Sequence, residues 1–347
     1  MIGASHIGIA AFRGGGGVSV NPDFISTWDT TQAGSASDTV VLPLLSGGTY
    51  SGTIDWGDGN TSPLSYGNRS HTYAAGGTYT ITISGIDIQG FQFNNGGDKA
   101  KITNVSNWGN LTLTTNSVFY GCSNLDITAT DAPTLSTTSI QNFFFNCSAL
   151  TTPDLSAWNV GSVTDMRGCF YGCVNFNGDV TTWNVASVTF FGNLFLSEGM
   201  FVICRAFNQD ISGWNVSAGI NFGNMFYDCD VFNQPIGNWT TSSATNMYGL
   251  IRLCAAFDQS VGGLDITTVS DLRDFATGIT ISTANYDDTL IQWEAQLQAA
   301  YPSGVGYPYT IATNFGSSQY TLGSAADTAR ASLIANFGWT ITDGGPV

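Results

Sequence analysis

Three aspartates in the middle of the chain are spaced as if they belonged to a repeating unit. Asp154, Asp179 and Asp210 each lie four residues before a tryptophan. If successive units stack in register, the three carboxylates line up about 5 Å apart, the distance between neighbouring strands. Like charges at that distance raise one another's pKa, and a bound cation or a network of sugar hydroxyls would relieve the repulsion.

Three roles are open to these carboxylates. The sequence favours the simplest, in which each aspartate accepts hydrogen bonds from its own turn. The second is a binding site, and the third is catalysis, because a retaining glycosidase holds two carboxylates about 5 Å apart. The two histidines, His6 and His71, lie outside the repeats, so no Ser-His or Cys-His arrangement can form within them. We therefore expect no enzymatic activity, no cofactor and no metal.

Six of the seven cysteines recur at intervals of 25 or 26 residues, with one interval of 31. Each follows a phenylalanine, or once an isoleucine, by three positions: Cys122, Cys147, Cys173, Cys204, Cys229 and Cys254. A zinc site needs four converging ligands, which usually come as close pairs, and only Cys169 and Cys173 form such a pair. One cysteine per repeat predicts a column of buried thiols, with Cys169 outside the pattern.

Tryptophan and asparagine recur with the same period. The tryptophans are Trp158, Trp183, Trp214 and Trp239, and the asparagines are Asn177, Asn208 and Asn233, followed by Asp258. An indole column can stack on sugar rings, but its place beside alternating residues favours the core. The asparagines resemble the ladder of leucine-rich repeats, in which side-chain amides hydrogen-bond the backbone of a tight bend.

A period of about 25 residues indicates stacked repeats, each of which buries its apolar side chains only against its neighbours. Residues 179–183 and 210–214 alternate polar and apolar side chains, as a half-buried strand does. The pattern predicts one short parallel strand per repeat and an irregular or single-turn helical segment near each Phe-x-x-Cys.

The flanks of the repeats have different patterns. Residues 39–45 and 78–83 read as strands on either side of an Asp-Gly turn, which predicts a small all-β domain. Residues 286–300 and 324–336 have helical spacing. We expect four parts: a Gly-rich N-terminal attachment segment at 1–23, a β-domain at 24–92, the repeats at 93–275, and a C-terminal cap at 276–347.

Composition excludes several partners. Only 10% of residues are charged, and the formal net charge is -16, which repels phosphate backbones and anionic lipid heads. No apolar run reaches the ~18 to 20 residues that span a bilayer. We therefore expect no nucleic-acid binding and no membrane insertion. The start of the chain lacks the basic n-region of a secretory signal, so no Sec-type export is expected.

Several segments resemble the BspA-like leucine-rich-repeat surface proteins. They are Phe-Asn-Gln-Asp-Ile-Ser at 207–212, Gly-Trp-Asn-Val-Ser at 213–217, Phe-Asn-Gln-Pro-Ile-Gly-Asn-Trp at 232–239, and the terminal stretches at 285–293 and 338–344. The resemblance implies surface display and adhesion, without enzymatic activity as a rule.

Upstream, Trp-Gly-Asp-Gly at 56–59 and the segment at 71–81 resemble a PKD-like β-sandwich module, which is often found on surface proteins. Asp58 of this motif is expected to form a turn rather than to bind calcium. Together the resemblances imply a mainly β fold class: a PKD-like β-sandwich followed by a short leucine-rich-repeat-type solenoid of ~25-residue coils, with a small α-helical C-terminal cap.

A protein of adhesion modules without an export signal suggests a bacteriophage particle, and the Gly-rich start is similar to attachment segments of phage structural proteins. The sequence thus predicts a virion surface spike, fibre or decoration protein that adheres to the host. Its expected partners are other virion proteins, reached through the N-terminal segment, and a host surface glycan or protein. We expect binding through Asp154, Asp179 and Asp210, and a homo-oligomer.

Two alternative functions stay open. A bacterial cell-surface adhesin would carry the same modules on a cell envelope. A polysaccharide-depolymerising tailspike would use the aspartates for catalysis.

Overall fold

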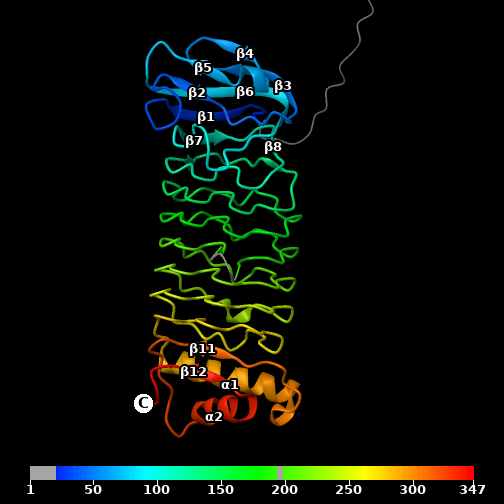
Figure 1. Cartoon of the computed structure of the whole chain (residues 1–347), viewed down its shortest axis with the longest axis vertical. Helices are drawn as coiled ribbons and strands as arrows, with labels where there is room; N and C mark the ends of the chain where they lie inside the picture. Colours follow the sequence, from blue (N-terminus) through cyan, green and yellow to red (C-terminus); the bar gives the residue numbers. More distant parts are fainter. Residues whose placement is uncertain (1–20, 194–197) are drawn as a thin grey trace, which may run out of the picture.

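The computed structural model describes residues 21–193 and 198–347 of the chain. The molecule is elongated, with a β-sheet at the N-terminal end, a stack of irregular coils in the middle, and two helices at the C-terminal end (Figure 1). Each turn of this stack, about 25 residues long, is called a coil below. In the described residues no helix is long and apolar enough to cross a membrane.

An eight-stranded sheet forms the N-terminal end. Its strands are β1 (Phe24–Asp29), β3 (Tyr50–Asp55), β4 (Thr61–Pro63), β6 (Thr78–Gln89), β7 (Ile102–Asn107), β8 (Leu111–Leu113), β9 (Asp126–Ile127) and β10 (Thr134–Leu135). Six of them run in the order β10-β8-β6-β1-β7-β9, while β3 pairs with β6 and β4 with β3. A separate pair consists of β2 (Thr39–Val41) and β5 (Ser70–Thr72), and η1 (Tyr66–Asn68) precedes β5. Alternate residues of β1, including Phe24 and Trp28, face the core.

The predicted PKD-like sandwich is wrong, because the sheet does not stop where the repeats begin. Strand β1 pairs with β7, and β6 pairs with β8, so strands on both sides of residue 92 share one sheet. The strands before residue 92 are mostly antiparallel, whereas β8, β9 and β10 join in parallel. The first coils therefore continue the sheet, and residues 24–92 do not form a separate sandwich.

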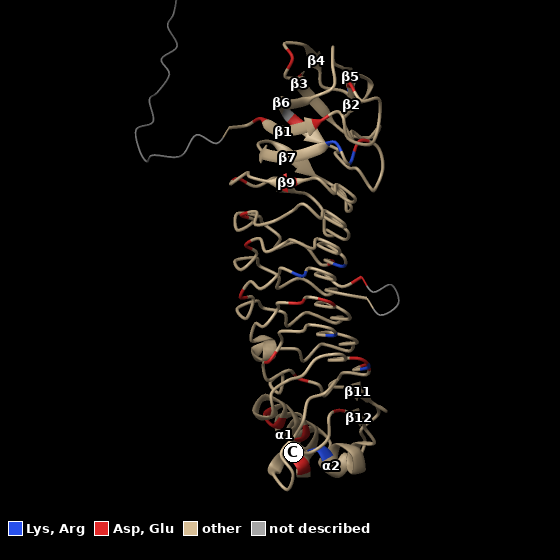
Figure 2. Cartoon of the chain, turned by 90° about the vertical axis from the view of Figure 1, so that its left-hand side faces the viewer, with Lys and Arg blue, Asp and Glu red and all other residues tan. Residues whose placement is uncertain are grey.

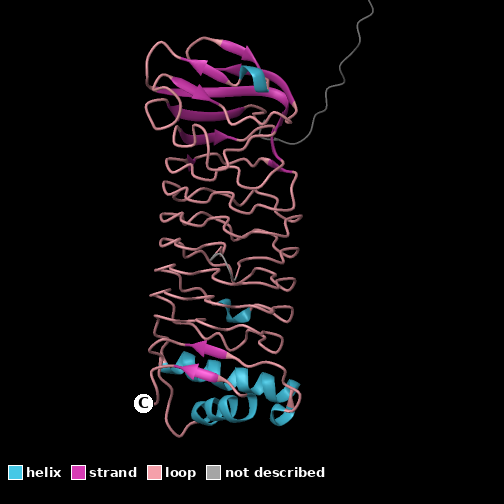
Figure 3. Cartoon of the chain, in the orientation of Figure 1, coloured by secondary structure: helices cyan, strands magenta, loops and turns pink. Residues whose placement is uncertain are grey.

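The coils that follow contain no strands in the described residues between β10 and α1, and they are drawn as loops (Figure 3). Isolated parallel bridges join them instead, from Ser139 to Asp165 and onward through Phe190, Asn221, Asn246 and Asp271. The predicted strands at 179–183 and 210–214 are absent. The predicted leucine-rich-repeat-type solenoid is therefore wrong as a fold class, and a mainly β structure with one continuous sheet and two helices replaces it.

Left-handed backbone residues explain why the coils are not extended. In most coils the residue five positions before the repeat cysteine and the residue just before it have positive φ; these residues are Ser117, Gly121, Asn142, Asn146, Gly168, Gly172, Ile203, Asn224, Asp228, Gly249 and Leu253. Gly, Asn and Asp adopt this conformation at low cost, and two such residues per coil interrupt any strand. Ile203 and Leu253, at φ 60° and 58°, do not belong to these types.

Phenylalanine rings stack from coil to coil in the core. The ring centroids of Phe144 and Phe170 lie 5.5 Å apart, and the same distance separates Phe170 from Phe201. A second column runs beside the first, and in it the ring centroids of Phe207 and Phe232 lie 5.9 Å apart. All of these rings are buried. Offset-stacked rings add to the burial of apolar area that holds neighbouring coils in register.

Buried donors link each coil to the preceding one. The thiols of Cys147, Cys173, Cys204, Cys229 and Cys254 donate to phenylalanine carbonyls of the coil before, over 2.8–3.1 Å. Burial raises the pKa of these thiols, so they keep the donated proton. The indole N–H groups of Trp183, Trp214 and Trp239 likewise donate to carbonyls of the preceding coil. The burial predicted for both columns is confirmed.

The asparagines form a ladder at the side of the stack. The Oδ1 atom of Asn177 accepts from the backbone N–H of Asn208, and Asn208 in turn accepts from Asn233. Asn233 accepts from Asp258, and Asp258 accepts from Ser282. Each side chain thus satisfies a backbone donor of the next coil, as the sequence predicted.

The C-terminal end covers the last coil with helices. In helix α1 (Thr283–Ala300), the indole N–H of Trp293 donates a hydrogen bond to the Val261 carbonyl. Helix α2 (Ala325–Phe337) begins after Ser324, whose hydroxyl caps its first backbone N–H groups. The other elements here are β11 (Ala312–Asn314), which pairs in parallel with β12 (Thr340–Thr342), and the short helices η2 (Ile236–Asn238) and η3 (Pro302–Gly304).

We predict that Ile203→Asn stabilises the protein. A β-branched residue in the left-handed region costs roughly 1–2 kcal/mol, and Asn relieves that strain, so the free energy of unfolding should rise by about 1 kcal/mol. Denaturant titration measures the change. Ile220→Asn, at an exposed residue that is not among the positive-φ positions, is the matched control and should bring no gain. A loss of stability for Ile203→Asn would contradict the strain argument.

Candidate functional site

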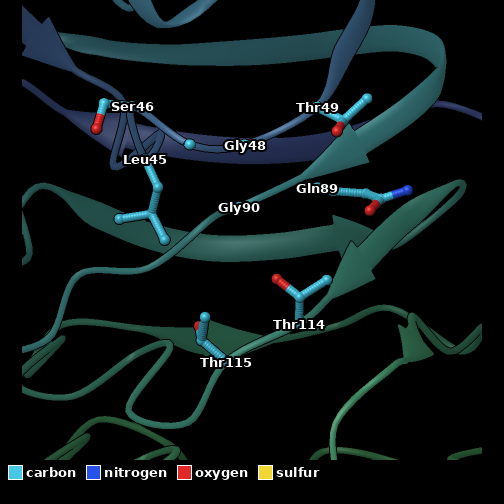
Figure 4. Close-up of a pocket in the computed structure, with 9 residues that line it drawn as sticks. Leu45, Ser46, Gly48, Thr49, Gln89, Gly90, Thr114 and Thr115 are labelled. Atoms are coloured by element: carbon cyan, nitrogen blue, oxygen red, sulfur yellow. The ribbon is translucent and has the colours of Figure 1, made fainter.

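Two adjoining cavities lie where the N-terminal sheet meets the first coils, and together we call them the groove. The first has a volume of about 580 Å³ and the second about 590 Å³, and Thr114 lines both. The lining residues of the first are Leu45, Ser46, Gly47, Gly48, Thr49, Gln89, Gly90, Thr114 and Thr115 (Figure 4); those of the second are Thr114, Leu135, Ser136, Thr137, Thr138 and Ser162. Each volume is typical of a small-molecule site.

The upper wall of the groove is the loop between β2 and β3, and Tyr50 holds it in place. The Tyr50 hydroxyl lies 2.8 Å from the carbonyl oxygens of both Leu45 and Gly90. Burial raises the pKa of Tyr50, so its hydroxyl keeps the proton that it donates. A Cβ atom at Gly48 would lie 2.1 Å from the Tyr50 hydroxyl, which explains the glycine there. Gly47 faces open space.

Hydroxyls and backbone amides supply the chemistry of the groove. None of its lining residues is ionisable. Eight of the fourteen are serine or threonine, whose hydroxyls both donate and accept hydrogen bonds. The Thr115 hydroxyl oxygen is buried and has no hydrogen-bond partner among the described residues.

Sequence reasoning did not find this groove. The walls of its first cavity come from three separate segments around residues 45–49, 89–90 and 114–115, which the pairing of β6 with β3 and β8 brings together. The available signal was local: Ser-Gly-Gly-Thr at 46–49 precedes β3, and two threonines at 114–115 follow β8.

The three predicted site aspartates lie elsewhere, on the coils. Asp154 and Asp179 form a parallel bridge. The Oδ1 atom of Asp154 accepts from the backbone and hydroxyl of Ser156, and Asp179 makes the same pair of bonds with Thr181. Asp210 accepts from the backbone of Ser212.

These bonds change the expected electrostatics of the aspartates. Hydrogen bonds from Ser156 and Ser212 lower the pKa of Asp154 and Asp210, so the predicted rise through mutual repulsion is wrong for these two. Each carboxylate is engaged in its own turn, which was the favoured interpretation. No cluster of three metal-ligating side chains occurs among the described residues. Binding at Asp154, Asp179 and Asp210 stays a prediction.

Charged residues are distributed unevenly around the coil stack. Acidic positions alone follow one edge, whereas the basic positions lie elsewhere on the coils together with further acidic ones (Figure 2). Each arginine of the described coils is close to an aspartate: Arg167 to Asp165, Arg205 to Asp228, Arg252 to Asp274, and Arg273 to Asp271. The basic positions are therefore neutralised by nearby carboxylates, and they offer no uncompensated positive surface to an anion.

Asp58 belongs to a small polar cluster in the N-terminal sheet region. The Nε2 atom of His71 lies 2.8 Å from its Oδ2 atom, and the His71 ring stacks on Trp56 with centroids 4.9 Å apart. Asn60 donates to Asp58 from its backbone and its side chain, which confirms the predicted turn. Desolvation raises the pKa of Asp58, but the hydrogen bonds from His71 and Asn60 outweigh it and lower the pKa to about 2.

The Asp58 pKa predicts a pH dependence of stability. A carboxyl whose pKa is lowered on folding stabilises the protein above its unfolded pKa of about 4, and that contribution is lost as the pH falls to about 2. Asp58→Asn should therefore be less stable than the wild type at pH 7, and the difference should shrink between about pH 4 and pH 2. Urea titrations at several pH values measure it, and a constant difference would contradict the assignment.

Comparison with known proteins places the repeats in one family. The family described as "Mycoplasma protein of unknown function, DUF285" matches residues 91–198 and 196–289. No curated protein and no solved structure matches. The match does not extend to the predicted PKD-like module, and its description does not mention a bacteriophage. The predicted resemblance to a phage-borne BspA-like protein with a PKD-like module is therefore wrong. The match spans more than half of the chain, and the protein belongs to the DUF285 family.

Proposed function

We propose that this protein is a non-enzymatic adhesin of a bacterial cell surface that binds a neutral glycan in the groove. The observation that carries the proposal is the lining of the groove, in which eight of fourteen residues are serine or threonine and none is ionisable. A sugar offers hydroxyls that donate and accept, and they match the hydroxyls of these residues. A charged ligand would lose its hydration in the groove without gaining a counter-charge.

Net charge supports a neutral ligand. The formal charge of the chain is -16, which repels anionic polymers such as nucleic acids and acidic polysaccharides. Cationic ligands would meet the acidic edge of the coils rather than the groove. Among polymers at a cell surface, an uncharged glycan is compatible both with the uncharged lining of the groove and with the negative net charge of the protein.

Adhesion fits the groove better than hydrolysis does. Glycoside hydrolysis needs two carboxyl groups on either side of the scissile bond, and no carboxyl group lines either cavity. The elongated coil stack places the groove at one end of the molecule, far from the helices (Figure 1). Several copies displayed together, as a homo-oligomer or as neighbours on a surface, would convert weak binding into firm attachment.

We predict that Thr114→Val weakens binding without harming the fold, because Thr114 lines both cavities of the groove. The residue is half-buried at the surface, so loss of its hydroxyl should leave the free energy of unfolding nearly unchanged. Loss of one hydrogen bond to the ligand should weaken binding about tenfold, which corresponds to ~1.4 kcal/mol. Gly47→Phe places a ring in open space within the groove and should block binding.

A panel of immobilised neutral glycans, comprising linear glucans, mannans, galactans and chitin oligomers, serves as the probe, with hyaluronan as the charged comparison. Thr182→Val is the control, because it removes a threonine hydroxyl that lies outside the groove. Binding to a neutral glycan that Thr114→Val and Gly47→Phe weaken and Thr182→Val preserves supports the proposal. Absence of binding to every neutral glycan overturns it.

A further inference from the structure

Two columns of serine and threonine continue from the groove along the coils. The first column is Ser136, Ser162, Ser187, Ala218, Ser243 and Thr268, and the second, two residues later in each coil, is Thr138, Thr164, Thr189, Ile220, Thr245 and Ser270. We call the two columns the hydroxyl face. Its residues are exposed or half-buried, whereas the residues between them, such as Val163, Val188 and Val269, are fully buried.

Backbone hydrogen bonds hold the second column in strict register. The N–H group of Thr164 donates to the carbonyl of Thr138 over 2.8 Å, and the same bond recurs at 2.9 Å through Thr189, Ile220, Thr245 and Ser270. Consecutive members therefore lie one coil apart. At a spacing of ~4.8 Å per coil, the five steps extend the face over about 24 Å.

The hydroxyls of the second column have a fixed polarity. Those of Thr164, Thr189, Thr245 and Ser270 each donate to the carbonyl of the residue one coil before. Because a carbonyl can only accept, the hydroxyl proton is used inside the protein. Each oxygen then presents its lone pairs outward, and the face offers a row of pre-oriented acceptors to a ligand that donates repeatedly.

The hydroxyl face carries no charge and joins the groove directly. None of its positions is ionisable, and the flanking Asp165 and Asp271 are each paired with an arginine two residues on. Ser136, Thr138 and Ser162 belong both to the face and to the second cavity of the groove. A chain that leaves the groove therefore passes onto the hydroxyl face without crossing a charged surface.

We propose that the ligand is a long, neutral, extended polysaccharide that lies in the groove and along the hydroxyl face, parallel to the axis of the coil stack. This inference rests on the proposed function and names its substrate class. The sugar hydroxyls donate to the outward oxygens of successive coils, and each coil adds one weak contact. Affinity grows with chain length until the polymer spans the face.

One coil interrupts the hydroxyl face. Ala218 and Ile220 replace the hydroxyl residues of both columns, and the Ile220 side chain is 40% exposed. The interruption separates three hydroxyl-bearing coils next to the groove from two beyond it. It provides a test in both directions, because hydroxyls can be removed beyond the gap or restored within it.

The test measures affinity against chain length with size-fractionated oligomers of the neutral glycan that the wild type binds. In the wild type, oligomers long enough to span the face should bind at least tenfold more tightly than those that fill only the groove. Ser243→Ala with Thr245→Val should weaken the long oligomers several-fold and leave the short ones unchanged. Ala218→Ser with Ile220→Thr should strengthen only the long ones.

Controls separate this inference from the proposed function. Thr182→Val removes a comparable hydroxyl elsewhere on a coil and should affect neither length class. Denaturant titration confirms that each variant folds. If no oligomer of any length binds, the proposed function is overturned. If short and long oligomers bind equally and the variants at 243 and 245 change nothing, the groove acts alone and the extended site is overturned.

Discussion

The structure depends on how each coil satisfies the backbone carbonyls of the coil before it. A β-ladder would do so with a continuous row of N–H groups, but the coils carry too many left-handed residues to form strands. Side chains supply the missing donors: a cysteine thiol and a tryptophan indole inside, and a glutamine amide at the side. An unsatisfied buried carbonyl is costly, so the identity of these residues is set by hydrogen bonding as much as by size.

This arrangement leaves the outside of the stack free to vary. The phenylalanine columns and the inward donors fix the spacing of the coils, and the exposed positions between them contribute little to the core. On one side those positions carry serine and threonine, and on another they carry aspartates bonded to their own turns. A regular interior thus produces a regular exterior, and any surface residue type that recurs with the period becomes a straight column.

Features that follow from the repeat period could be predicted from the sequence. Features that depend on strand pairing between distant segments could not. The spacing of Cys147 and Cys173 was enough to place both thiols in the core, and the amide ladder at Asn177 followed from the same register. Alternation at 179–183 suggested a strand, but alternation also fits a coil whose turns prevent extension. The sheet across residue 92 was not predictable from either flank, since β1 and β7 are paired only in three dimensions.

Neighbouring coils exchange hydrogen bonds in both directions: the Cys254 thiol donates to the coil before, and the backbone N–H of Phe144 donates to the coil after. The contacts along the stack are therefore those of nearest neighbours. Duplication or deletion of one whole coil within the gene would preserve every donor and acceptor pair on both sides of the change. The chain can therefore alter its length in discrete steps, with the sheet at one end and the helices at the other unaltered. The length of the stack is, in this architecture, an evolvable quantity that costs no redesign of the interior.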